Sequence, residues 1–349
     1  MSVLQRLSPI CFNGGKPLPK RQLHKSAYRE CKGVVCSQMT CSAISRVAGA
    51  YACAKSNKRR ITKPFNFQSE CLDFLIGKVG RDANFVLSGK LSLWTVDGRK
   101  RYSFRVPDKF KDIFESCIEK DSLTIFKRNG KLRASLCVTI EVPDEQGVLP
   151  VGIDLNETNA IVAVDSDSRT FFESGKAYKV RNKRSRKTRK RIQSKFDTKK
   201  AQKKDTRSLR RLLKRLSHKR SNRTTEFCRQ TAKKFVDWVR PNSVLVFESL
   251  KGLSKKKKGF NKSLNRRICE WPRSELLQRI KNKAELRGIP IVEINPAYTS
   301  QTCSRCGQLG NRERHNFSCS CGHTQHADIN AAINIRTKYA EGRKANSGR

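Results

Sequence analysis

The sequence predicts an α+β protein with several domains, and three features indicate this. Apolar and polar residues alternate over residues 85–142, which is the period of β-strands. Apolar residues recur at helical spacing before and after that stretch. Four cysteines near the C-terminus are paired as metal ligands often are. The 349 residues are enough for two or three domains, each with a buried core.

The N-terminal region is predicted to be helical, and a β region follows it. Ile44, Val47 and Tyr51 lie at helical spacing within residues 36–55. Further on, the dipeptides Asp97-Gly98 and Asn129-Gly130 each separate two alternating segments, and both accept the positive φ of a two-residue hairpin turn. Two hairpins this close together predict a small β-barrel or sheet domain.

A second β region begins after residue 148. Residues 151–155 and 160–164 are apolar around a short turn, and residues 169–172 add a third strand. Two more short apolar strands are predicted at 243–247 and 289–294. Long helical segments lie between these strands, which is the pattern of an α/β domain.

The charge of the chain indicates a polyanionic partner. Lys and Arg number 76 against 30 Asp and Glu, for a formal net charge of +46. Binding to nucleic acid releases counterions, and a small acidic substrate does not need so many charges. No run of 18 apolar residues and no signal peptide is present, so we expect no membrane association. An intracellular, cytoplasmic and nucleoid-associated location is expected, with the 14 cysteines reduced or bound to metal.

The most basic segment is predicted to form two long helices over residues 179–239. Residues 179–223 contain 22 Lys and Arg against two Asp, and Leu209, Leu212 and Leu216 repeat at helical spacing. A solvated surface is the usual role of charged helices, but charges of one sign repel one another unless an anion covers them. The predicted nucleic-acid-binding residues are Lys183, Arg184, Arg186, Lys187, Arg189, Lys190, Arg191, Arg207, Arg210, Arg211, Lys214 and Arg215.

Paired cysteines predict one structural Zn²⁺ per chain. The pairs occur in the strings CSRCG and CSCG, where Gly307 and Gly322 allow a tight turn around the sulfurs. The second pair is closer in sequence than is usual for zinc. His315, His323 and His326 are therefore alternative ligands, although surface histidines are the simpler interpretation of each. The predicted zinc ligands are Cys303, Cys306, Cys319 and Cys321.

Three acidic residues stand at the ends of apolar elements. Asp154 lies within an apolar strand, Glu248 ends another, and Asp328 opens an apolar helix. Each alone is explained as a cap or turn residue, and an N-cap is the obvious role for Asp328. Together they follow the element order of an RNase H-like fold, in which three carboxylates hold two Mg²⁺ or Mn²⁺ ions for phosphodiester hydrolysis.

Several strings in the chain resemble the TnpB (OrfB) family of insertion-sequence proteins. GIDLNETNAIVAVD and VFESLKGL are similar to its first two RuvC motifs. YTSQTCSRCGQLGNRERHNFSCSCGHTQHADINAAINI is similar to its C-terminal signature. LHKSAYRE and LSLWTVDGRKRYSF also resemble it, so the likeness covers about residues 23–335.

The resemblance implies an RNA-guided DNA endonuclease of a transposable element, related to the type V CRISPR effectors. Its partners would be a guide RNA from the element's own end and double-stranded target DNA, with no small-molecule substrate. The catalytic residues carried over are Asp154, Glu248 and Asp328. Two alternatives stay open: a non-cleaving or truncated copy that binds nucleic acid, and a DNA transposase or recombination factor.

The family's architecture, a β-barrel wedge with a helical insertion followed by a RuvC-like domain with an inserted zinc ribbon, sets the expected domains. Family members commonly begin with a wedge strand and a longer helical segment, whereas only about 22 residues precede LHKSAYRE; a truncated copy, a late start codon and a reduced recognition lobe are the alternatives. The expected domains are a helical recognition region 1–84, a wedge 85–148, a nuclease domain 149–300 with 324–340, a zinc ribbon 301–323 and a disordered tail 341–349.

Overall fold

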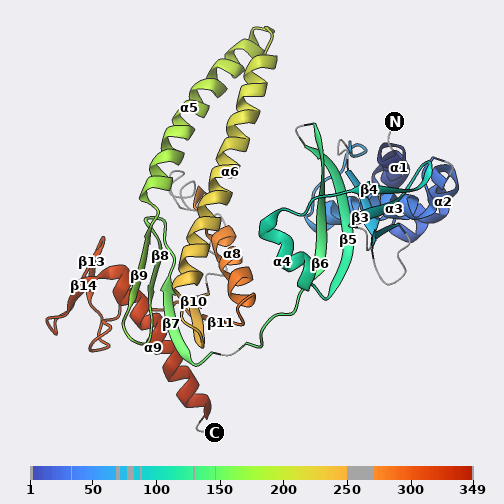
Figure 1. Ribbon diagram of the computed structural model, residues 1–349. Coiled ribbons are helices and arrows are strands. Elements are labelled where there is room, and N and C mark those ends of the chain that lie inside the picture. The colour runs from blue at the N-terminus through green and yellow to red at the C-terminus, as the bar shows by residue number, and fades with distance from the viewer. Residues whose placement is uncertain are drawn as a thin grey trace. The chain divides into compact units, whose positions relative to one another are not determined.

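The chain divides into two compact units, Met1–Glu141 and Val142–Arg349. Figure 1 shows the computed structural model, whose helices and strands confirm the predicted α+β multidomain class. The structure describes residues 3–32, 34–67, 71–76, 82–86, 89–128, 130–145, 147–249 and 270–347.

Three helices form the first part of the N-terminal unit. Leu7, Leu23 and Ile44, one from each helix, are fully buried in a shared core. The hydroxyl of Tyr51 lies 2.9 Å from that of Ser8 and adds a polar contact inside this core. The helical prediction for residues 36–55 is confirmed. The helices are α1 (Val3–Phe12), α2 (Lys20–Lys32) and α3 (Ser37–Ser56), with a short 3₁₀ turn η1 (Asn13–Gly15) after α1.

Two antiparallel sheets of three strands complete this unit, and both predicted hairpins are present. The first hairpin pairs Thr95 with Gly98, so its turn is Val96-Asp97, one residue earlier than predicted. Gly98 has a φ of +91°, which explains a glycine at the end of the turn. Within the described residues the sheet orders are β1-β5-β6 and β2-β3-β4; closure into a barrel stays a prediction. The elements are β1 (Cys71–Leu75), β2 (Ala83–Val86), β3 (Lys90–Thr95), β4 (Gly98–Ser103), η2 (Asp108–Phe110), α4 (Lys111–Ser116), β5 (Glu119–Arg128) and β6 (Lys131–Thr139).

A five-stranded mixed sheet is the centre of the second unit. Its order is β11-β10-β7-β8-β9, in which β10 is parallel to both β7 and β11 while β8 is antiparallel to its two neighbours. β7 and β10 read as nearly continuous apolar runs because both faces of the sheet are covered. The strands are β7 (Leu149–Asp154), β8 (Asn159–Val164), β9 (Thr170–Ser174), β10 (Ser243–Glu248) and β11 (Ile291–Ile294).

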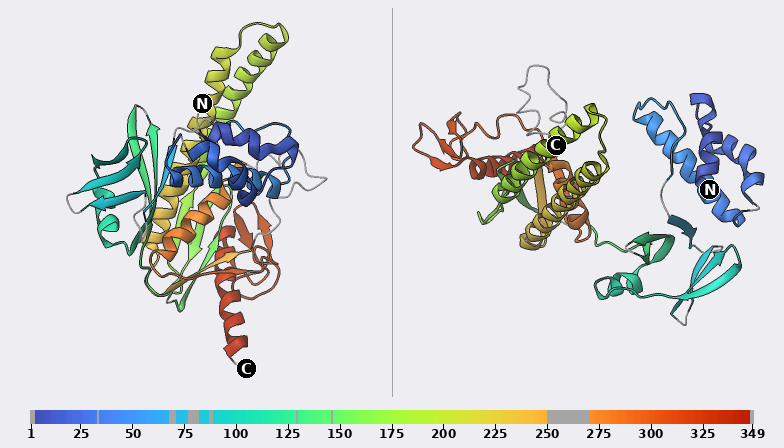
Figure 2. Two further views of the ribbon diagram at one scale, coloured as in Figure 1. Left: turned by 90° about the vertical axis from the view of Figure 1, so that its right-hand side faces the viewer. Right: turned by 90° about the horizontal axis from the view of Figure 1, so that it is seen from above.

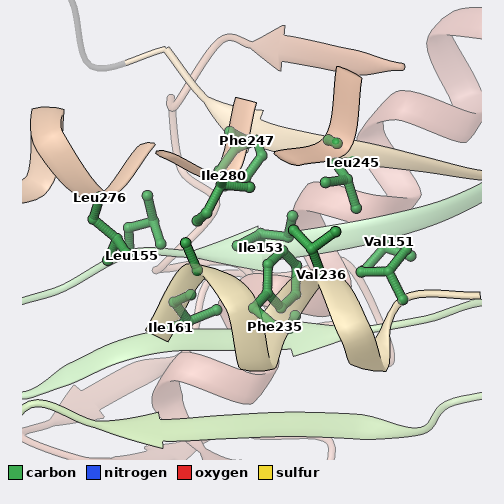
Figure 3. Packing of buried hydrophobic residues seen from close by; sticks show 14 of the residues in the cluster. Val151, Ile153, Leu155, Ile161, Phe235, Val236, Leu245, Phe247, Leu276 and Ile280 are labelled. Atoms are coloured by element: carbon green, nitrogen blue, oxygen red, sulfur yellow. The ribbon is translucent and has the colours of Figure 1, made fainter. Parts of the chain in front are cut away.

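Helices cover the two faces of this sheet. Alternate residues of a strand point to opposite faces. Leu245 and Phe247 accordingly join the core cluster with α6 (Arg207–Trp238) and α8 (Arg273–Glu285) (Figure 3). Val246 packs instead with Ile335 of α9 (Ala327–Ser347). Gly152 permits this close packing, because a Cβ there would lie 2.0 Å from the carbonyl oxygen of Ala332.

The predicted pair of long basic helices is confirmed. α5 (Lys176–Ala201) and α6 run antiparallel, and their far end extends well beyond the sheet (Figures 1 and 2). At the near end, the rings of Tyr178 and Phe227 stack with centroids 4.4 Å apart. Within the described residues the base of the hairpin packs against the core, and most of the basic side chains along its length are exposed.

The C-terminal segment consists of a small three-stranded ribbon and the last helix. The ribbon strands are β12 (Asn311–Glu313), β13 (Asn316–Ser318) and β14 (Thr324–His326), in that order. The predicted disordered tail from residue 341 is wrong as far as residue 347, because α9 continues through a proline-free segment to Ser347. Residues 348–349 lie outside the described residues. No helix in the described part of the chain is both long and apolar enough to cross a membrane.

Candidate active site and metal centre

The three predicted catalytic carboxylates come from three different elements. Asp154 ends β7 and Glu248 ends β10, and these neighbouring strands are parallel, with Ile153 opposite Phe247. Their carboxyl ends therefore meet at one edge of the sheet. Asp328 lies in the first turn of α9 and is 1% exposed. Sequence positions 154, 248 and 328 are thus brought to one place by the sheet and its covering helix.

The electrostatics of Asp154 show how close these groups are. Burial is the largest cause that raises the pKa of Asp154 from its ordinary value to about 7, and the charges of Asp328 and then Glu248 act in the same direction. The amide of Asn156, which donates to Asp154 at 3.1 Å, acts in the opposite direction. A shift of this kind is typical of carboxylates that share a functional site.

Asp328 is held by two partners that the sequence reasoning missed. Asn159 Nδ2 donates to Oδ2 of Asp328, and Arg312 Nη2 donates to Oδ1, each at 2.7 Å. The Asp328 side chain is 2% exposed, so a buried charge is compensated by an arginine of the ribbon. Neither partner has a sequence signal of its own, because an asparagine after a turn and an arginine in a basic string are both common.

Glu248 has a hydroxyl and a guanidinium group as polar neighbours. The hydroxyl of Thr299, which is buried, donates to Oε1 of Glu248. Arg273, at the start of α8, has a buried Nε that lacks a hydrogen-bond partner in the structure. Burial lowers the pKa of Arg273, and the charge of Glu248 opposes this change, so the guanidinium lies within electrostatic reach of the carboxylate.

Two asparagines of α9 fasten the segment before the ribbon. Asn330 Nδ2 donates to the carbonyl of Thr302 at 2.8 Å, and Asn334 Nδ2 donates to the same oxygen at 2.6 Å. Their spacing of four residues places both on one face of the helix. That spacing in NAAIN was a usable signal, because paired buried amides need partners.

The four predicted zinc ligands form one group. The sulfurs of Cys303, Cys306, Cys319 and Cys321 all lie within 4.8 Å of one another, an arrangement that could bind a metal. Cys303 lies 3.8 Å from Cys321 and Cys306 lies 3.6 Å from Cys319. The backbone N–H of Cys321, which donates to the Cys319 sulfur, and then the neighbouring cysteines lower the pKa of the Cys319 thiol to about 6, while the cysteines around Cys306 raise the pKa of that thiol to about 12. A lowered thiol pKa favours the thiolate, which is the form that ligates metals.

The three histidines that were alternative zinc ligands lie outside the cysteine group. His323 Nε2 lies 3.4 Å from the Ser304 hydroxyl and outside the cysteine group. His315 and His326 form a second group with Asp328, again with donor atoms within 4.8 Å of one another. Within the described residues, groups of three or more donors at this distance are limited to these two, so Asp154 and Glu248 belong to neither.

The twelve predicted nucleic-acid-binding residues lie along the hairpin of α5 and α6. Arg186 pairs with Glu270 at 2.7 Å, and Arg207 pairs with Asp205 at 3.2 Å. The other ten have no ion pair within the part of the chain that the structure describes, and they are exposed. A long surface of uncompensated positive charge results.

Comparison with known proteins shows which families this chain resembles. Residues 135–267 match the OrfB_IS605 family, described as a probable transposase, and residues 274–335 match the Cas12f1-like TNB domain. The predicted resemblance is confirmed: the chain is similar to the TnpB (OrfB) proteins, a family related to the type V effectors.

Individual relatives are similar to parts of the chain. A TnpB-like protein of Aquifex aeolicus (strain VF5) is 35% identical over 130 residues, which cover 34% of this chain and 42% of the relative. The CRISPR-associated endodeoxyribonuclease Cas12f1 of Sulfoacidibacillus thermotolerans is 43% identical over 75 residues, covering 20% of this chain and 18% of the relative. The matched stretches thus span less than half of these relatives. A solved complex of Cas12f1 with guide RNA and target DNA is 17% identical, with a TM-score of 0.43, covering 96% of this chain and 90% of that one.

Proposed function

We propose that the protein is an RNA-guided DNA endonuclease of a transposable element, with its cleavage site at Asp154, Glu248 and Asp328. The observation that carries the proposal is the convergence of these three carboxylates; burial of Asp154, together with the charges of Asp328 and Glu248, raises its pKa to about 7. The sheet order and the parallel pairing of β7 with β10 support an RNase H-like, RuvC-type domain in the second unit. The first unit would then supply the recognition region and the wedge.

The carboxylates fit a pair of hard divalent cations, Mg²⁺ or Mn²⁺. Oxygen ligands suit such cations, and mutual repulsion among buried carboxylates is relieved by positive charge. When bound, two such ions supply an activated water and stabilise the leaving oxygen of a phosphodiester. The chain's own residues orient the ligands: Asn159 and Arg312 hold Asp328, and Thr299 holds Glu248.

The partners follow from charge and from the relatives. The hairpin of α5 and α6 would contact the phosphates of guide RNA or double-stranded target DNA through its unpaired Lys and Arg. The Cas12f1 relatives are named CRISPR-associated endodeoxyribonucleases, which supports DNA as the substrate. One structural Zn²⁺ on the four cysteines would hold the ribbon, and with it Arg312, in place.

Two measurements test the proposal. RNA that copurifies with the full chain is sequenced, and a duplex matching that RNA is offered with Mg²⁺. Wild type should cut it, and Asp154→Asn should bind it without cutting. Glu173→Gln is the matched control, since Glu173 is a carboxylate of the same sheet that lies outside the site; it should cut normally.

The two alternatives give different results in the same experiment. A non-cleaving copy would bind nucleic acid of mixed length and leave every duplex intact. A transposase or recombination factor would join DNA strands without needing the copurified RNA. Cleavage by Asp154→Asn at the wild-type rate would falsify the assignment of the site.

A further inference from the structure

A second cluster of donor atoms lies beside the proposed cleavage site. It contains His315 from the turn between β12 and β13, His326 at the end of β14 and Asp328 at the start of α9. One donor atom from each of the three lies within 4.8 Å of the other two. The backbone N–H of Ala327 donates to the carbonyl of His315 at 2.7 Å, which ties the ribbon turn to the start of the helix.

The imidazole rings of His315 and His326 lie against each other. The rings of His315 and His326 stack with centroids 5.6 Å apart and planes 22° apart. Phe172 packs edge-on against His326 at 5.3 Å. His326 Nδ1 accepts the backbone N–H of Asp328 at 3.2 Å. A ring nitrogen that accepts a hydrogen bond carries no proton, and its single lone pair is engaged with this N–H, so a cation bound at Nδ1 would replace the hydrogen bond.

Asp328 keeps coordination capacity despite its two partners. Arg312 donates to one of its oxygens and Asn159 to the other. An ionised carboxylate has about four lone-pair sites, so lone pairs remain on both oxygens. His315 is exposed, which leaves a path for a small ion from solvent.

We propose that His315, His326 and Asp328 bind a borderline divalent cation such as Zn²⁺, at a site separate from the four cysteines. Two imidazoles and one carboxylate are a donor set that zinc uses in proteins, with water at the open position. Mg²⁺ prefers oxygen ligands and keeps its waters, so this set discriminates against it.

Occupancy of this site would regulate the cleavage site, and this step rests on the proposed function. Asp328 belongs to both donor sets. When its carboxylate is bound together with the two imidazoles, it is withdrawn from Asp154 and Glu248. Zn²⁺ beyond the amount that fills the ribbon should therefore inhibit cleavage supported by Mg²⁺.

Binding is tested on the full chain with its ribbon already filled. Equilibrium dialysis against Zn²⁺ near neutral pH, followed by metal analysis, should find two zinc ions per wild-type chain and one in His315→Gln or His326→Gln. His323→Gln is the matched control, because His323 lies in the same ribbon but outside the cluster, and it should keep two. With Co²⁺ as the probe, the second equivalent should lack sulfur-to-metal charge-transfer absorption. A wild-type chain that stops at one zinc, or histidine variants that still hold two, overturns the proposal.

Inhibition is tested as the cleavage rate against Zn²⁺ concentration at constant Mg²⁺, each protein being compared with its own zinc-free rate. Wild type and His323→Gln should lose activity at concentrations that His315→Gln tolerates. Equal inhibition of all three proteins contradicts the regulatory role. If no protein cleaves, the proposed function fails while dialysis still decides the metal site; if all cleave but none binds a second zinc, only the metal site fails.

Discussion

The cysteine group and the carboxylate group are built in opposite ways. The four sulfurs come from one segment, residues 303–321, and already lie within 4.8 Å of one another. The three carboxylates come from positions 154, 248 and 328, and each is held by a partner of its own. Thiols can approach one another without charge, whereas buried carboxylates repel and need compensation. A sulfur site can therefore be assembled locally, while the oxygen site depends on the whole domain.

The largest expected effect is on the cysteine group. Cys303→Ser should lose the bound zinc and unfold the ribbon, because metal-binding free energy is folding free energy in such sites, on the order of 10 kcal/mol. Zinc analysis and thermal unfolding measure both effects. Cys137→Ser is the control, since Cys137 is exposed on β6, in the other unit of the chain. If Cys303→Ser holds as much zinc as wild type, this cysteine is not a ligand.

The second-largest expected effect is on the stability of the protein and concerns Asp154, because ionisation of this carboxyl destabilises the folded state. Its folded pKa is raised to about 7 from an ordinary value of 3.8, so the stability it contributes is present at low pH and is lost as pH rises toward 7. In metal-free protein, Asp154→Asn should therefore be more stable than wild type at pH 8 by roughly 4 kcal/mol. The advantage should shrink as pH falls through 7 toward 4. Urea unfolding at several pH values tests this; a difference that does not change with pH contradicts the raised pKa.

Arg312 is expected to have a smaller effect. Arg312→Gln removes the charged partner of buried Asp328 and should destabilise the protein by roughly 2 kcal/mol, because the carboxylate stays buried with less compensation. Arg314→Gln, two residues away on the same ribbon and exposed, is the control. Chemical unfolding of both variants measures the difference. Equal stabilities would mean that Asp328 does not depend on this ion pair.

Substitutions in the basic hairpin are expected to have the smallest effect on stability. They test nucleic-acid binding independently of the cysteine group and the carboxylate group. Changing Lys187, Arg189 and Lys190 to Gln should lower the slope of log affinity against log salt by roughly three, because each phosphate that is no longer neutralised lowers it by about 0.9. Stability and zinc content should not change. Lys233 and Lys234 form the control pair, because each is already paired with a carboxylate of the protein. A slope that falls equally in both sets would rule out a specific role for the exposed hairpin.

Local pattern explains what could be predicted. The alternation around residues 97 and 130, the helical spacing of Ile44 and Tyr51 and the cysteine pairs are all short-range features, and each appears in the structure. The helical end of the chain was predicted wrongly, because polar composition alone does not exclude a helix that continues from a packed segment. The hairpin turn was misplaced by one residue, since its register is set by strand pairing.

The sequence by itself therefore determined the class of fold, the group of four cysteines and the candidate carboxylates, because each depends on residue type and short spacing. Only the tertiary structure decided which polar groups compensate those carboxylates: Asn159, Thr299 and Arg312 come from separate elements. It also decided that His315 and His326 face Asp328 and not the cysteines. Such contacts arise from the packing of α9 and the ribbon against the sheet, and spacing along the chain carries no record of them.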